Sequence, residues 1–297
     1  MKTPTSHYLT AILCGFLLFT LALIYGCNVV QDAGKTITGS VQGVVHGFAE
    51  VKQAHQLDEA DEDELGKSVA ILVTNKYAPT DREKLVKYVN LVGYTLVAAS
   101  PKPDRHYAFG VLETDDIGAY SGPNGYVMVT RGAIQNMRDE AELAGVLAHE
   151  LTHVIEQHGL SAARSAAAKA GYLDATKAVL QSDDAVKFID TGVDAVVRNG
   201  YDKPQENAAD AGAVQLLIAA GYDPHSYANF LSHLAALQAA APRPSQDPGA
   251  AAATMKEIMS THPGIQDRYP AVAKEIADAG SPGGATMKER FRANVGP

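Results

Sequence analysis

The stretch LAGVLAHELTHVIEQHGL at residues 143–160 constrains the fold more than any other part of this sequence. Its apolar residues recur at helical spacing, and Asp139 followed by Glu142 has the form of a capping box, so we expect a helix to begin there. Gly159 is the expected C-terminal stop of that helix. Whether the helix binds a metal or merely carries histidines decides how the rest of the chain is interpreted.

His149 and His153 are one helical turn apart, so their side chains project from the same face and could bind one metal ion. Glu150 lies about 100° further round the helix. It would be near such an ion without coordinating it, and could hold a water molecule and take its proton. The alternative is an ordinary helix with two surface or core histidines, because so short a motif also arises by chance. A third ligand elsewhere in the chain would favour the metal.

The segment KPQENAAD at residues 203–210 offers such a ligand. Pro204 suits the first position of a helix, and Gly221 suits its end. Glu206 and Asp210 are four residues apart and share one helix face. Glu206 can be the third ligand, and Asp210 can accept the outer N–H of a ligand histidine. Alone, the pair would indicate a solvated helix face; together with the histidine motif, it favours a metal site.

The remaining pattern predicts a mixed fold with few strands. Apolar residues at helical spacing predict a helix over 81–100, and the acidic run from residue 58 predicts the solvated start of an earlier one. Strands are expected at 106–113 and 126–130, with a tight hairpin turn at 122–125, where Asn precedes Gly. The chain after the second strand has the pattern of helix and loop. The predicted class is therefore α+β, mostly helical, with a small sheet.

The N-terminal segment differs from the rest of the chain. Lys2 is the only charged residue among the first 31, and residues 9–26 are almost entirely apolar. This pattern indicates a secretory signal, or an uncleaved membrane anchor of just sufficient length. The residues Ile-Tyr-Gly-Cys that end at Cys27 resemble a bacterial lipobox, which favours cleavage before Cys27 and its lipidation. Asn28 resembles the residue that sends such lipoproteins to the outer membrane.

Composition excludes one class of partner and one source of stability. The net charge is −9, so we expect no binding to nucleic acid, which would need a basic face. Hydrophobic residues make up 46% of the chain, as in a globular protein with a sizeable core. Cys14 and Cys27 are the two cysteines; one would leave with the signal and the other would carry lipid. Stability would then come from the core and a metal rather than from a disulfide.

Five motifs follow one another along the chain: Glu64-Leu65-Gly66, GAYSGPNGYVMVTRGAI, DEAELAGVLAHELTHVIEQHG, ENAAD, and Ser-Thr-His-Pro at 260–263 followed by Arg268. Through these motifs the chain from about residue 60 to residue 270 resembles the HtpX/CAAX-prenyl-protease family of zinc endopeptidases, most closely its bacterial periplasmic and lipoprotein members. The sequence departs from the usual family pattern at Gly118-Ala119-Tyr120-Ser121, where an Asn-Ala-Phe-Ala-like run is common, and at Gln205, where an acidic residue is common.

This resemblance implies a gluzincin-like site with one Zn²⁺ per chain. His149, His153 and Glu206 would be the metal ligands, Glu150 the general base, and Asp210 the partner of a ligand histidine. The metal-binding helix would pack under the small sheet, and an edge strand of that sheet would pair with the backbone of extended or unfolded polypeptide. The residues expected in that edge strand are Tyr126, Val127, Met128, Val129 and Thr130.

Several further residues keep two interpretations. His262 would either cap the open metal position and keep the enzyme latent, or act in zinc or transition-state binding. Arg268 is expected to form a structural salt bridge, with substrate binding as the alternative. His158 is expected to serve packing or capping. Tyr201 and Tyr222 are both candidates for stabilising the oxyanion, and the sequence does not choose between them.

The predicted function is zinc-dependent cleavage of unfolded or misassembled cell-envelope proteins, from a lipid-anchored position on the periplasmic face, at the outer membrane. A non-catalytic, chaperone-like lipoprotein is the second hypothesis, although it would have no need of a base beside the metal. An integral membrane protease is a third and weaker one. The predicted domains are a signal peptide at 1–26, a tether at 27–57, a metallopeptidase domain at 58–280 and a flexible tail at 281–297.

Overall fold

The computed structural model describes residues 55–56, 59–171, 179–180, 184–197, 200–240, 262 and 264–296. All of them belong to one compact unit, Gly39–Pro297. The predicted signal peptide, Cys27 and nearly all of the predicted tether lie outside the described residues. Within the described ranges, no helix is both long enough and apolar enough to cross a membrane.

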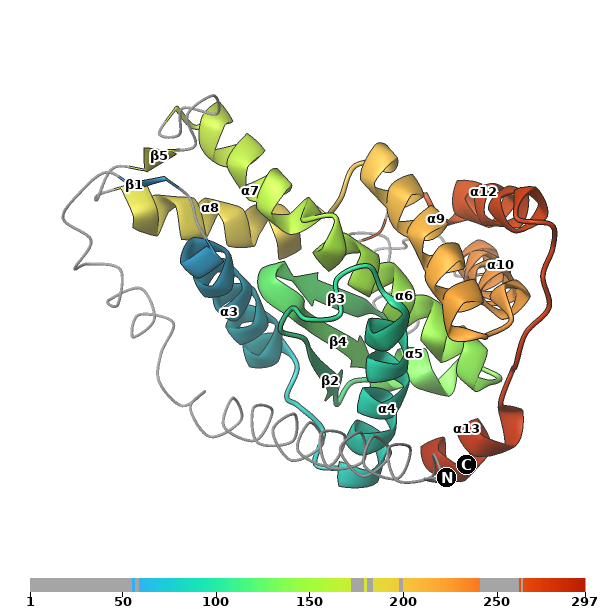
Figure 1. Ribbon diagram of the computed structural model, residues 1–297. Coiled ribbons are helices and arrows are strands. Elements are labelled where there is room, and N and C mark those ends of the chain that lie inside the picture. Colours follow the sequence, from blue (N-terminus) through green and yellow to red (C-terminus); the bar gives the residue numbers. More distant parts are fainter. Residues whose placement is uncertain are drawn as a thin grey trace, which may run out of the picture. The chain divides into compact units, whose positions relative to one another are not determined.

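A three-stranded sheet lies at the centre of Figure 1. Its strands are β2 (Ala108–Leu112), β3 (Ala119–Gly122) and β4 (Tyr126–Thr130), in the order β2-β4-β3. β4 pairs in parallel with β2 and antiparallel with β3. The β3–β4 hairpin turns through a short 3₁₀ segment, Pro123–Gly125, in which Asn124 has φ 57° and the glycine has φ 98°. The predicted Asn-Gly hairpin is therefore confirmed.

The prediction that Tyr126–Thr130 is an edge strand is wrong. β4 is hydrogen-bonded on both sides, which makes it the central strand, and the edges of the sheet are β2 and β3. The hairpin signal reveals only that β3 and β4 are neighbours. After β2 the chain forms β3, and β4 then lies between these two strands. The parallel pairing of β2 with β4 joins strands that are not consecutive in the chain, so no local sequence signal predicts it.

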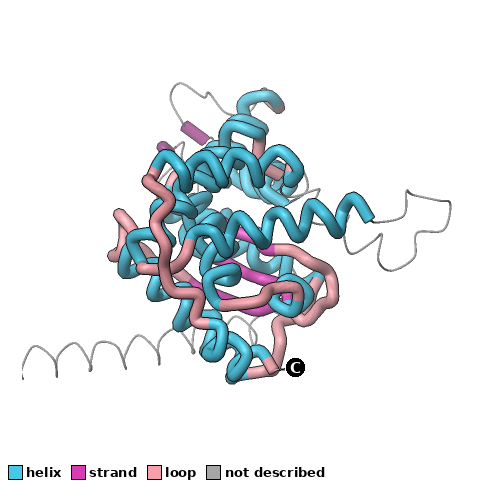
Figure 2. The backbone as a smooth tube through the Cα atoms, turned by 90° about the vertical axis from the view of Figure 1, so that its right-hand side faces the viewer, coloured by secondary structure: helices cyan, strands magenta, loops and turns pink. Residues whose placement is uncertain are grey.

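Helices surround the sheet, as the side view in Figure 2 shows. The histidine helix α6 (Glu140–Ile155) packs against β3 and β4, α4 (Glu83–Ala99) against β2, and α3 (Glu59–Lys76) against β3 and the hairpin turn. The predicted class, mostly helical with a small sheet over the histidine helix, is confirmed. The other elements are α5 (Arg131–Gln135), α7 (His158–Lys169), α8 (Asp184–Val197), α9 (Lys203–Ala220), α10 (Pro224–Ala240), α12 (Ile265–Asp278), α13 (Lys288–Val295), and the paired short strands β1 (His55–Gln56) and β5 (Val179–Leu180).

Both faces of the sheet are buried. Along β4, Val127 and Val129 belong to the larger apolar cluster, which includes side chains of α4, α6, α9 and α10. Met128 points to the opposite face and belongs to a smaller cluster with side chains of α3, α7 and α8. The sheet is thus held between two helical layers, and α6 lies on the side of the larger cluster.

Two glycines allow the neighbouring helices to approach α6 closely. A Cβ atom at Gly145 would lie 2.6 Å from Cβ of Tyr227, on α10. A Cβ atom at Gly212, on α9, would lie 2.4 Å from Cγ2 of Thr152. Real Cβ atoms do not approach other atoms so closely, so any larger residue would push the helices apart. These contacts bring side chains of α9 and α10 within reach of the histidines.

The end of α6 differs from the prediction. Asp139 caps the start of the helix as expected, because its side chain accepts a hydrogen bond from the backbone N–H of Glu142. The helix stops at Ile155, however, and the left-handed residue that ends it is Gln157, with φ 56°. Gly159 lies inside α7, and a Cβ there would be 3.0 Å from the Pro123 ring. The narrow space between α7 and the hairpin turn, rather than a helix stop, therefore favours a small residue at this position.

The acidic start of α3 is only partly solvated, because two of its acidic residues are buried while Asp63 and Glu64 are partly exposed. Asp61 and Glu62 are both inaccessible to solvent, apart from a few per cent of their surface. The carboxylate of Glu62 accepts hydrogen bonds from Arg105 and from Gln157, at 2.8 and 3.0 Å. Asn124 also donates its backbone N–H to Glu62. This carboxylate is therefore a junction between α3, the hairpin turn and the end of α6.

The prediction of a flexible tail at 281–297 is also wrong for its described residues. Ala285 forms a bridge with Tyr222, α13 begins at Lys288, and Phe291 is buried against the main core. Arg290 forms an ion pair with the buried carboxylate of Glu140. The polar composition of the tail suggested no packing, but this ring, this guanidinium and backbone hydrogen bonds of Ala285 and Thr286 attach it to the rest of the protein.

Candidate metal centre

Two helices bring the predicted ligands together. His149 and His153 lie on the second half of α6 and are 3% and 1% exposed, while Glu206 lies in the first turn of α9 and is 1% exposed. α9 begins with a complete capping box in which Asp202 and Gln205 exchange hydrogen bonds. The glutamine that departs from the usual family pattern thus fixes the helix start that presents Glu206.

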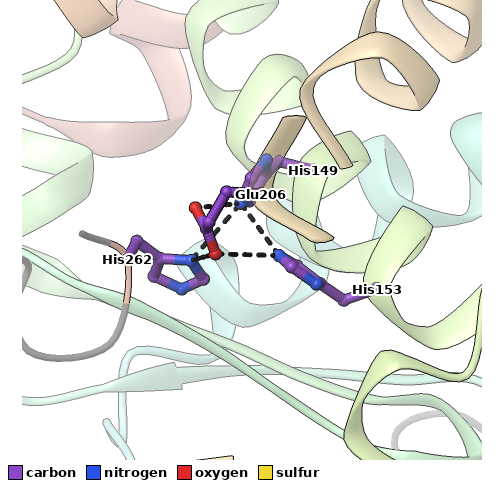
Figure 3. Close-up of side chains that lie close together, drawn as sticks. All are labelled: His149, His153, Glu206 and His262. Carbon is purple, nitrogen blue, oxygen red and sulfur yellow. Dashed lines mark hydrogen bonds and ion pairs between the residues drawn. The ribbon is translucent and has the colours of Figure 1, made fainter. Parts of the chain in front are cut away.

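The side chains of four residues, His149, His153, Glu206 and His262, lie close together, as Figure 3 shows, and each offers a ligand atom within 4.8 Å of the others. Nε2 of His149 lies 3.1 Å from Nε2 of His153 and 3.6 Å from Oε2 of Glu206, and Nε2 of His153 lies 3.5 Å from Oε1 of Glu206. Nδ1 of His262 lies 3.3 Å from Nε2 of His149 and 3.0 Å from Oε1 of Glu206. In a tetrahedral site with bonds of 2.0–2.1 Å to zinc, neighbouring ligand atoms are about 3.4 Å apart. The donor set and its spacing therefore fit a zinc ion.

The charges of the site also favour a cation. Among the described residues, the carboxylates of Glu206 and Asp210 face the guanidinium of Arg268, and that of Glu150 faces His262, so the three carboxylates leave an excess of two negative charges when the histidines are neutral. Buried charges are costly unless they are compensated. Although burial lowers the pKa of His262, the adjacent Glu206 and Glu150 raise it to about 10. The carboxylates therefore favour a positive charge beside them, and a bound divalent ion would supply one.

Each predicted ligand histidine has its own outer partner. Nδ1 of His149 lies 3.0 Å from the carboxylate of Asp210, and Nδ1 of His153 lies 2.8 Å from Nδ1 of His158. If Nε2 of each ring faces a metal, each Nδ1 carries the proton and donates it to that partner. Asp210 thus lies where the sequence predicted it. His158 has a contact that was not predicted, because it is five residues from His153 and becomes its neighbour only through the left-handed turn at Gln157.

Arg268 and Tyr227 hold Asp210 in place. The guanidinium donates to both oxygens of Asp210, at 2.9 and 2.7 Å, and its Nη1 lies 3.0 Å from Oε2 of Glu206. The hydroxyl of Tyr227 donates to Asp210 at 2.7 Å and accepts from Arg268 at 2.9 Å. These contacts favour the structural ion pair predicted for Arg268 over substrate binding. Nothing in the sequence indicated Tyr227.

Glu150 lies beside the four ligand atoms without joining them. It is 1% exposed, and its Oε1 lies 3.2 Å from Nε2 of His262. Its Oε2 has no hydrogen-bond partner among the described residues. Burial by itself raises the pKa of Glu150, but the adjacent His262, His149 and His153 lower it to about 2. The carboxylate is therefore ionised at neutral pH, as a proton acceptor must be.

The two candidate tyrosines lie in different places. The ring of Tyr201 stacks on His153 with centroids 4.0 Å apart, so this residue belongs to the site. The hydroxyl of Tyr222 donates to Glu140 at 2.6 Å, at the opposite end of α6. Tyr222 is therefore not placed to stabilise an oxyanion.

Comparison with known proteins supports the geometry. The model of a family described as "Peptidase family M48" matches residues 83–276. The chain is 27% identical over 187 residues to the beta-barrel assembly-enhancing protease of Escherichia coli strain K12, across 60% of this chain and 36% of that protein. It is 30% identical over 159 residues to the protein of the same name from Yersinia pestis, across 51% of this chain and 33% of that one. The chain spans about a third of the length of these curated relatives.

Proposed function

The chain belongs to peptidase family M48, and from that premise we propose that it is a zinc-dependent endopeptidase that acts on extended polypeptide. The observation that carries this proposal is the cluster of four buried ligand residues, whose ligand atoms lie within 4.8 Å of one another beside an ionised carboxylate. A purely structural zinc site would have no use for Glu150, whose second oxygen has no partner among the described side chains.

Glu150 is the residue that moves the proton in this proposal. Its two oxygens border the space beside the ligand atoms, where the carboxylate can hold a water molecule, take its proton and deliver it to the leaving amine. When bound, zinc supplies a Lewis acid that acidifies the water and polarises the peptide carbonyl. Asp210 and His158 keep the protons of His149 and His153 on Nδ1, so both Nε2 lone pairs remain directed inward.

The substrate would bind along β3, not along β4 as the sequence suggested. β3 is an edge strand whose outer side pairs with no strand among the described residues, and it packs against α6. An extended peptide can add to such an edge as a further strand. Compact domains cannot present their backbone in this way, so unfolded segments are the expected substrates.

His262 would hold the enzyme in a resting state. Its Nδ1 takes the fourth corner of the ligand set, while its Nε2 contacts the base Glu150. One imidazole thus fills the position that a substrate carbonyl or water needs and also engages the proton acceptor. Of the two roles predicted for His262, these contacts favour latency, with cleavage following its withdrawal.

We also propose that the protein works in the cell envelope, with Cys27 as its lipid anchor at the outer membrane. The support is the apolar N-terminal segment that ends in a lipobox-like sequence, together with relatives that are named beta-barrel assembly-enhancing proteases. Misassembled envelope proteins would then be its substrates. This chain matches only about a third of those relatives, so the substrates are tested separately from the chemistry.

The test is cleavage of casein, an unfolded protein, by the full chain in mild detergent, with zinc content measured in every sample. Glu150→Gln should retain zinc and lose cleavage by about 10²–10⁴-fold, the contribution of a positioned general base. His262→Ala should raise basal cleavage. Zinc-loaded protein that cuts in neither the wild type nor His262→Ala would refute the endopeptidase and leave a chaperone-like scaffold, and full activity in Glu150→Gln would refute the role of the base.

A further inference from the structure

The carboxylate of Glu62, near the start of α3, contacts two residues whose backbone has a left-handed conformation. Its Oε2 accepts a hydrogen bond from the side-chain amide of Gln157 at 3.0 Å, and its Oε1 accepts one from the backbone N–H of Asn124 at 3.3 Å. The φ angles of these two residues are 56° and 57°. Residues other than glycine adopt such angles uncommonly, so both turns need contacts that hold them. Glu62 supplies one contact to each turn.

Glu62 is itself held in place. The helix that carries it lies so close to the hairpin turn that a Cβ atom at Gly66 would be 2.0 Å from the carbonyl oxygen of Pro123. The guanidinium of Arg105 donates to Oε1 of Glu62 at 2.8 Å, and Glu62 is 4% exposed. A carboxylate that is buried, paired with a charge and carried by a tightly packed helix can fix a neighbouring turn.

Of the two turns, the one at Gln157 leads to the metal centre. Gln157 connects α6 to α7, and its left-handed conformation places Nδ1 of His158 at 2.8 Å from Nδ1 of His153. Gln157 is exposed, so burial of its side chain does not fix its backbone. Among the described residues, the hydrogen bond to Glu62 connects this side chain to a rigid part of the fold. Whatever holds the turn therefore also holds the outer partner of a ligand histidine.

We propose that Glu62 is a positioning residue of the metal centre, which acts through Gln157 and His158 on the ligand His153. This inference rests on the zinc site of the proposed function and adds to it a residue of α3 that touches none of the ligands. Without Glu62, the turn at Gln157 would be free to adopt a more common backbone conformation. His158 would then leave His153, which would lose the acceptor that fixes its tautomer and would bind zinc more weakly.

The test measures zinc affinity, by competition with a chelator, in Glu62→Ala and in two double variants. Glu62→Ala should weaken zinc binding by about tenfold, the lower end of the range for the loss of an outer partner of a ligand histidine. Adding Gln157→Gly should restore most of this affinity, because glycine adopts a left-handed conformation without strain. Adding Asn124→Gly instead is the matched control. It relieves the other left-handed residue that Glu62 contacts and should restore none of the affinity.

Two results would overturn the proposal. One is wild-type zinc affinity in Glu62→Ala, and the other is equal zinc affinity in the two double variants, since a general effect on folding would not distinguish between the two glycines. If Glu62→Ala does not fold, Gln157→Ala and Gln157→Gly take its place, because both leave Glu62 paired with Arg105. The alanine variant should then bind zinc more weakly than the glycine variant, and equal affinities would refute the role of the turn.

Failure of this inference and failure of the proposed function give different results. Zinc affinity is read without any cleavage, so a protein that cuts no casein but shows rescue by Gln157→Gly alone would support the role of Glu62 and refute the endopeptidase. A wild-type protein that cuts casein and shows no rescue would do the reverse. Wild-type protein that binds no zinc would refute both.

Discussion

The two ends of α6 each hold a buried polar cluster, and the two clusters differ in how their charges are satisfied. At the first residue, the carboxylate of Glu140 is 0% exposed and accepts hydrogen bonds from Tyr88 and Tyr222, at 2.8 and 2.6 Å. Arg290 completes the set with two further contacts. We call these four residues the Glu140 cluster. Every carboxylate oxygen in it meets a donor.

The metal centre, toward the other end of the same helix, has the opposite balance. Imidazole nitrogens of His149 and His153 face each other at 3.1 Å. Among the described side chains, two of the three carboxylates face the guanidinium of Arg268, and the third, that of Glu150, faces His262. The carboxylates of both clusters are almost fully buried, so burial of polar groups does not distinguish a functional site from a structural one. What distinguishes the metal centre is that its hydrogen-bond acceptors outnumber its donors, an imbalance that a bound cation would compensate.

Removing an outer partner at the metal centre should give the largest effect. His158→Ala should weaken zinc binding by about 10–100-fold, because the ring of His153 loses the acceptor that fixes its tautomer. Competition with a zinc chelator measures this affinity. His158→Gln should recover part of it, since its amide oxygen can accept the same proton. Equal zinc affinity in wild type and His158→Ala would show that the contact does not position the ligand.

Breaking the Glu140 cluster should affect folding and leave zinc binding unchanged. Arg290→Ala should lower the free energy of unfolding by about 1–3 kcal/mol, toward the lower end because the guanidinium is 40% exposed. Arg292→Ala, an exposed residue of the same helix, is the control and should change little. Denaturant unfolding gives the free energies. A loss of zinc affinity in folded Arg290→Ala would mean that the two ends of α6 are coupled.

Glu142, a buried carboxylate near Glu140 at the start of α6, extends the comparison of the two clusters. Glu142 accepts a hydrogen bond from the backbone of Arg138 at 2.6 Å, and burial raises its pKa to about 7. A carboxyl group with a raised pKa in the folded protein costs stability as the pH rises from its ordinary value of 4.5 through 7. Glu142→Gln should therefore gain stability relative to wild type with rising pH, on the order of 1–2 kcal/mol between about pH 4 and pH 8.

Unfolding by denaturant at several pH values measures this gain, with Glu289→Gln, at an exposed position of α13, as the control. The opposite trend, in which Glu142→Gln loses stability as the pH rises, would place Glu142 with Glu140 among the carboxylates that have enough donors. In that case the shortage of donors would be confined to the metal centre.

Much of the architecture can be predicted from local pattern. The periodicity of residues 81–100 gives α4, Asn124-Gly125 gives the hairpin, and Asp139 gives the start of α6. The wrong predictions share a cause. Whether β4 is central, whether the chain after residue 280 packs, and whether Glu62 is solvated all depend on partners far away in sequence. Local composition contains no information about those partners.

In the candidate site, too, some features follow from local sequence and others depend on distant partners. The sequence by itself determined that His149 and His153 share a helix face and that Glu206 and Asp210 share another, because 3.6 residues per turn fixes such neighbours wherever the helix lies. Only the tertiary structure decided that His158 and Tyr227 join the site, that β3 rather than β4 is an edge strand, and that His262 lies beside the other candidate ligands. The helix geometry is set by the backbone of each segment, whereas these contacts depend on how closely separate segments pack.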